Sequence, residues 1–121
     1  MDVFDATIEL SSHGYVSDLK KTLSSLQNPT RFQILAALLD GKEYTVAELN
    51  DFVPTISQSA LSQHLTKLRR AQIVSRRRQS QNIHYKIKDA KVAELMRDLQ
   101  DKYTDDRMFT RVAAIKKLRA N

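Results

Sequence analysis

Residues 57–70 read SQSALSQHLTKLRR, and this stretch carries the clearest structural pattern in the chain. Leu61, Leu65 and Leu68 recur at i, i+4 and i+7, which places them on one face of an α-helix. Ser57 stands just before the periodic residues and is a favourable N-cap. The spacing therefore predicts a helix from Gln58 to about Ala71 that buries its leucines and turns polar side chains outward.

The outward face of this helix is rich in side chains that can read base edges. Glutamine suits adenine, serine suits several bases, and lysine suits guanine or phosphate. His64 is expected either to contact DNA, which is favoured, or to lie on the helix flank. The candidate DNA-reading residues are Gln58, Ser59, Ser62, Gln63, His64 and Lys67.

A shorter helix is predicted just upstream. Residues 45–48, Thr-Val-Ala-Glu, form a capping box in which Thr45 and Glu48 each satisfy an unpaired backbone amide of the other. The helix that follows is expected to bury Leu49, Phe52 and Val53, and Pro54 ends it. Two helices joined by a short turn, the second polar on its outer face, constitute a helix-turn-helix.

A basic β-hairpin is predicted downstream. Residues 83–88 alternate between apolar and polar, as in a strand with one buried face, and residues 79–82 form its polar tip. Basic side chains on such a wing reach phosphates, while an amide at the tip can enter a groove. The candidate wing residues are Arg76, Arg77, Arg78, Gln81, Asn82 and Lys86.

The basic charge is concentrated in this same part of the chain. Residues 54–88 contain eight lysines and arginines and no acidic residue. The remainder holds 12 basic and 14 acidic residues, a net charge of −2, although the whole chain carries +6. A basic segment on a nearly neutral scaffold indicates a polyanion-binding face, with a merely solvated face as the less favoured alternative.

The rest of the chain is predicted to be helical. Ser17 and Asn28 are candidate N-caps for two helices before the helix-turn-helix, and Gly41 is a C-terminal stop. A further apolar stripe runs over residues 92–103, and a basic helix is expected at about 109–120. We expect an N-terminal arm over 1–15, a winged helix-turn-helix domain over 16–104, and a C-terminal basic helix over 105–121.

Several functional classes are excluded by what the sequence lacks. It contains no cysteine, so disulfides, thiolate metal sites and thiol redox sensing are absent. No Gly-rich phosphate loop or nucleophile elbow is present, and the protein is not expected to be an enzyme. No apolar run is long enough to span a bilayer and the N-terminus lacks signal-peptide features, so no membrane partner and a cytoplasmic location are expected.

The combined motifs resemble the ArsR/SmtB family of bacterial repressors. The resemblance rests on residues 57–65, on 67–69, 73–74, 77–78 and 83–85, and on the upstream run 26–35, LQNPTRFQIL. It implies a mostly α-helical, dimeric winged helix-turn-helix with a small β-hairpin, whose first and last core helices pair across a two-fold axis. The dimer residues that it implies are Leu19, Leu23, Val92, Leu95, Met96, Leu99 and Tyr103.

The family's sensor residues are missing. Many relatives bind metal through Cys-Val-Cys, where this chain has Thr45-Val46-Ala47. Another family site uses Asp and His pairs on the last core helix, of which only Asp89 is kept. We therefore expect no metal site and no cofactor, and the sequence does not identify an inducer.

Together these observations predict a sequence-specific, DNA-binding transcriptional regulator. It is expected to act as a repressor that binds an inverted repeat in double-stranded DNA as a homodimer. One alternative is a derepressor that senses a small molecule in a pocket near the dimer seam. The other is an adaptor whose basic face binds RNA or an acidic protein.

Overall fold

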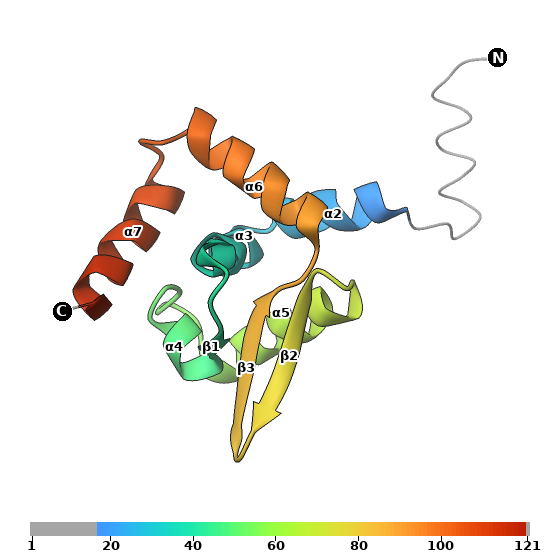
Figure 1. Ribbon diagram of the computed structural model, residues 1–121, viewed down its shortest axis with the longest axis vertical. Helices are drawn as coiled ribbons and strands as arrows, with labels where there is room; N and C mark the ends of the chain where they lie inside the picture. The colour runs from blue at the N-terminus through green and yellow to red at the C-terminus, as the bar shows by residue number, and fades with distance from the viewer. Residues whose placement is uncertain (1–16, 121) are drawn as a thin grey trace.

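The computed structural model describes residues 17–120, which form helices around a single core with a small sheet at one side (Figure 1). The elements are α2 (Asp18–Gln27), α3 (Pro29–Ala37), a 3-10 turn (Leu38–Asp40), β1 (Tyr44–Thr45), α4 (Val46–Asn50), α5 (Gln58–Arg70), β2 (Val74–Gln79), β3 (Asn82–Ile87), α6 (Ala90–Lys102) and α7 (Arg107–Ala120). The predicted arm over residues 1–15 lies outside the described residues.

Helix α3 is the centre of the core. Ile34, Leu35 and Ala37 have no exposed surface, and α2, α5, α6 and α7 all pack against this helix. Its position in the middle of the molecule is visible in Figure 1. A helix that is apolar on nearly every side is stable only when surrounded in this way.

The predicted helix starts are confirmed by their caps, but the predicted end of α4 at Pro54 is wrong: α4 ends at Asn50, and Phe52 and Val53 are buried from the turn that follows it. The side chains of Ser17, Asn28 and Ser57 accept backbone amides at the starts of α2, α3 and α5, and Thr45 and Glu48 form the complete capping box of α4. Gly41 ends the 3-10 turn in the left-handed conformation, with φ of 77°, which glycine adopts without a Cβ clash.

The sheet has one strand more than the sequence predicted. Strands β2 and β3 form the expected antiparallel hairpin, and β1 adds to the other edge of β3, pairing Tyr44 with Tyr85 and Thr45 with His84. The hairpin turn is shorter than predicted, because Gln79 and Asn82 still pair and only Ser80 and Gln81 form the turn. The third strand attaches the wing directly to the start of α4.

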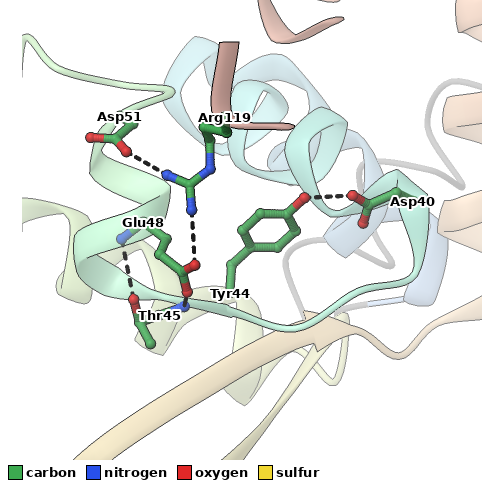
Figure 2. Close-up of polar contacts among 6 residues, drawn as sticks. All are labelled: Asp40, Tyr44, Thr45, Glu48, Asp51 and Arg119. Atoms are coloured by element: carbon green, nitrogen blue, oxygen red, sulfur yellow. Dashed lines mark hydrogen bonds and ion pairs between the residues drawn. The ribbon is translucent and has the colours of Figure 1, made fainter. Parts of the chain in front are cut away.

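Helix α7 packs against α3. Phe109 and Val112 are buried with the residues of α3, so the basic helix packs on the same core as the winged helix-turn-helix. Its last turn also holds α4. Arg119 donates to Asp51 and forms an ion pair with Glu48 at 2.8 Å, as Figure 2 shows. We call Arg119, Glu48 and Asp51 the α4–α7 clamp.

A second polar contact lies beside the clamp. The hydroxyl of Tyr44 donates to Asp40, which also forms an ion pair with Lys116 of α7 at 3.0 Å (Figure 2 shows the first of these). Although burial alone raises the pKa of Asp40, the hydrogen bonds from Tyr44 and the Lys42 amide and the nearby Lys116 hold it below its ordinary value. The base of the wing and α7 are therefore joined through one carboxylate.

The clamp predicts sensitivity to acid. The backbone amide of Thr45, donating to Glu48, is the main reason that the Glu48 pKa lies below its ordinary value; Arg119 lowers it further. A carboxyl with a depressed folded-state pKa contributes stability above its unfolded pKa and loses it as the pH falls. Glu48→Gln should lower the free energy of unfolding at pH 7 by about 0.3–1 kcal/mol and flatten its decline below about pH 5.

Urea unfolding followed by circular dichroism at pH 7 and pH 4 measures this difference. Glu94→Gln, at an exposed position on α6, is the matched control and should follow the wild type at both pH values. Parallel pH curves for Glu48→Gln and the wild type would contradict the role given to Glu48.

Candidate nucleic-acid interface

The helix-turn-helix is formed by α4 and α5 and the turn between them. Phe52 and Val53 are buried under this turn, anchoring it to the core. The side chain of Asn50 spans it, donating to the carbonyl oxygens of Val53 at 3.1 Å and Ile56 at 3.0 Å. These two bonds fix the angle at which α5 leaves α4, a role for Asn50 that the sequence analysis did not identify.

Helix α5 has the two faces that its sequence predicted. Leu61, Leu65 and Leu68 are fully buried. Four of the candidate reading residues, Gln58, Ser59, Gln63 and Lys67, are exposed, and Ser62 is half-buried. The exposed side chains begin at the N-terminal turn, the part of a recognition helix that meets base edges.

His64 is half-buried and has a partner within the protein. Its Nδ1 accepts a hydrogen bond from Nε of Arg31, on α3, at 3.3 Å. Burial, followed by the charges of Arg31 and Lys67, lowers the pKa of His64, which favours the neutral ring that this bond requires. His64 therefore positions Arg31 beside α5, and a contact with DNA through its other nitrogen stays a prediction.

The three wing arginines are not equivalent. Arg77 forms an ion pair with Glu43 at 2.6 Å, and Nε of the same side chain donates to that carboxylate at 3.1 Å. These hydrogen bonds raise the pKa of Arg77 and lower that of Glu43. Arg76 and Arg78 are exposed and form no ion pair within residues 17–120. The remaining candidates, Gln81, Asn82 and Lys86, are exposed.

The residues expected at a dimer seam separate into two groups. Leu19, Leu23 and Tyr103 are 66%, 55% and 58% exposed, and Leu95 is also exposed. Leu99 is partly buried against the core. The leucines lie on α2 and α6, both of which pack on α3, and Tyr103 is the C-cap of α6. These two helices therefore present apolar side chains outward.

Two residues of the predicted seam lie inside the protomer instead of on its surface. Val92 and Met96 are 1% and 0% exposed within one protomer, because they face the core that α3 occupies. They share the apolar stripe of α6 with Leu95 and Leu99, and helical spacing alone does not distinguish an inner from an outer edge of a wide stripe.

The positions at which relatives would bind metal have structural roles here. Thr45 caps α4, and Asp89 caps α6 by accepting the amides of Lys91 and Val92. Within residues 17–120, no group of three or more histidine, aspartate or glutamate side chains is arranged to hold a metal ion. The same residues include no helix that is long and apolar enough to cross a membrane.

Comparison with known proteins identifies the family. The model of the arsR family of bacterial regulatory proteins matches residues 28–76, which run from the start of α3 into the wing. Nodulation protein NolR of Rhizobium meliloti is 44% identical over 84 residues, covering 69% of this chain and 67% of NolR. The biofilm growth-associated repressor of Xylella fastidiosa is 39% identical over 84 residues, 69% of each chain.

A third relative also has a solved structure. Transcriptional activator HlyU of Vibrio cholerae is 40% identical over 81 residues, covering 67% of this chain and 73% of HlyU. Its structure superposes with a TM-score of 0.67 at 37% identity, covering 72% of this chain and 92% of that one. The winged helix-turn-helix built from α3 to α6 is thus a regulator's fold and not an enzyme's. The chain belongs to the arsR family of bacterial DNA-binding transcriptional regulators.

Proposed function

We propose that the chain is a homodimeric repressor that recognises an inverted-repeat operator through α5. The observation that carries this proposal is the acid-free outer face of α5, where glutamine and serine side chains stand exposed on a helix fixed by buried leucines. Such side chains can discriminate between DNA sequences by contacting base edges, whereas the basic wing gives affinity for phosphates. A dimer seated on a promoter represses by excluding the polymerase.

The exposed apolar side chains of α2 and α6 support a dimer. Leucines that are more than half exposed have a favourable free energy of burial, about 1.5–3 kcal/mol each when fully covered. A second copy meeting this face would create two-fold symmetry, which matches an inverted repeat.

The names of the relatives include both a repressor and an activator. The Xylella fastidiosa relative is called a repressor and HlyU an activator. Repression is proposed because it requires only occupancy of DNA, for which α5 and the wing suffice. A reporter fused to the bound promoter distinguishes the two, since deletion of the gene raises expression under a repressor and lowers it under an activator.

Fluorescence anisotropy tests the proposed function. The purified protein is titrated into DNA from upstream of its own gene and into a scrambled duplex, at several salt concentrations. We expect a preference of about a thousandfold or more, the low end for specific readers. Equal and steeply salt-dependent binding to both duplexes, and to further candidate promoters, would favour the adaptor that binds RNA or acidic proteins.

The wing provides a prediction about salt dependence. Arg78→Ala should flatten the slope of log affinity against log salt by about two units in the dimer, one for each protomer. Arg77→Ala should flatten it less, because Glu43 already neutralises that guanidinium. Anisotropy titrations between low and moderate salt measure both slopes. A larger loss in Arg77→Ala than in Arg78→Ala would show that the Glu43 pair opens on DNA.

A ligand-responsive regulator is the second candidate function. A mostly apolar pocket of about 220 Å³ lies where α3, α6 and α7 meet, lined by Phe32, Leu99, Tyr103, Asp106, Met108 and Phe109. Tyr103 belongs both to this pocket and to the proposed dimer face. A small apolar ligand bound there would change the geometry of the dimer. It would weaken binding to the operator without changing binding to scrambled DNA.

A further inference from the structure

A pocket of about 220 Å³ opens between α2, α3 and the C-terminal half of α5. Four cationic side chains and two hydroxyls line it: Lys20, Lys21, Ser24, Ser25, Arg31 and Lys67. Pockets for drug-sized ligands are larger, about 300–1,000 Å³. The size therefore suits a single compact group.

Within residues 17–120, no acidic side chain compensates the charges of this pocket. No acidic residue of the described chain lines it, and none of its cations belongs to an ion pair within residues 17–120. The cavity beside the α4–α7 clamp differs, because Lys42, Lys116 and Arg119 there face Asp40, Glu43 and Glu48. Like charges gathered around a partly enclosed space repel one another until an anion enters.

The hydroxyl groups differ in what they can offer an anion. Ser25 is buried, and its hydroxyl donates to the carbonyl oxygen of Lys21 at 2.9 Å, which fixes the wall of the pocket. Ser24 is exposed and has a hydroxyl proton to donate. Lysine, arginine and serine are the side chains that proteins commonly direct at phosphate oxygens.

The pocket is continuous with the proposed DNA-reading face. Lys67 belongs to both, since it lies on the outer side of α5. Arg31 is held beside α5 by its hydrogen bond to Nδ1 of His64, one turn before Lys67. An anion in the pocket would therefore sit at the flank of the recognition helix, where the DNA backbone passes when a helix occupies the major groove.

We propose that the pocket formed by Lys20, Lys21, Ser24, Arg31 and Lys67 binds a backbone phosphate of the operator, so that α2 forms a third DNA contact beside α5 and the wing. This inference rests on the proposed DNA-binding function and adds to it a phosphate-binding site that includes residues of α2. The contact carries no sequence information, but it fixes the register of α5 on the duplex.

A double substitution with a charge-matched control tests the proposal. Lys20→Gln with Lys21→Gln removes two positive charges from the pocket, and Lys91→Gln with Lys117→Gln removes two from exposed positions on α6 and α7. Glutamine preserves helix propensity in both pairs. Circular dichroism confirms that each variant is folded before operator affinity is measured.

With one phosphate bound per protomer, the pocket variant should flatten the salt slope of the dimer by about two units. When salt is raised from about 50 to 200 mM, the operator affinity of the wild type should therefore fall by a factor about ten times larger than the factor by which the affinity of the variant falls. The ratio of operator to scrambled-duplex affinity should stay unchanged. The control pair should retain the wild-type slope.

Three results would overturn the proposal. The first is a pocket variant with the wild-type slope, and the second is equal flattening in both pairs, which would reflect net charge alone. The third concerns free anions and is measured with inorganic phosphate at matched ionic strength. If phosphate raises the thermal midpoint of the wild type but not of the pocket variant, and both proteins have the same salt slope of DNA binding, the pocket binds a soluble anion instead of DNA. If the wild type bound operator and scrambled DNA equally, the proposed function would fail, while the slope comparison would still decide the pocket's role.

Discussion

Gln58→Ala is expected to remove most of the discrimination between the operator and a scrambled duplex. Gln58 is the first residue of α5 and is exposed, so its amide can reach a base edge in the major groove. A good bidentate contact is worth about 1–3 kcal/mol, and a homodimer makes it in both half-sites, so the expected loss is about 2–6 kcal/mol of specificity. Competition anisotropy with both duplexes measures this loss.

The substitution leaves the helix intact, because Ser57 supplies the N-cap and alanine favours helix. Gln100→Ala, at an exposed position on α6, is the matched control and should retain full discrimination. If Gln58→Ala kept its sequence preference while Ser62→Ala or Gln63→Ala lost it, the reading positions would lie one turn further along α5. Unchanged preference in all three would refute α5 as the reading helix.

Leu23→Glu is expected to convert the dimer to a monomer and to weaken operator binding by about a thousandfold, because two linked half-sites bind with an avidity that one does not have. Leu23 is 55% exposed on α2, so glutamate at this position is accommodated in an isolated protomer. Across a two-fold axis, however, two copies would place like charges in an apolar contact. Sedimentation velocity measures the change in mass, and anisotropy the change in affinity.

Leu118→Glu makes the same chemical change on a different surface. Leu118 is 76% exposed on α7, away from α2 and α6, so this variant should remain dimeric and bind the operator normally. A dimer that survives Leu23→Glu and Leu19→Glu would place the two-fold interface elsewhere. A dimer lost in Leu118→Glu would assign that interface to α7.

Local features of the chain were predictable because their causes are local. The caps at Ser17, Asn28 and Ser57 and the capping box at Thr45 require only a few neighbouring residues. The leucine spacing of α5 likewise specifies which face is buried. The family resemblance then ordered these elements into a winged helix-turn-helix.

Features that depend on distant partners were missed. Strand β1 contains only Tyr44 and Thr45, too few residues for an alternating pattern, and it exists because β3 offers an open edge. The spacing of α6 predicted an apolar stripe, but only the packed structure shows that Val92 and Met96 face the core. No local pattern singles out Lys20 and Lys21, which line a common pocket with Arg31 and Lys67 only in the folded chain.

The docking of α7 has a consequence for synthesis of the protein. Phe109 and Val112 belong to the core, and Arg119 contacts α4 across 71 residues of chain through its partner Glu48. Translation proceeds at about 5–20 residues per second, so α5 leaves the ribosome several seconds before the helix that completes its scaffold. A nascent chain therefore exposes α5, the proposed DNA-reading helix, before Phe109 and Val112 are available to complete the core.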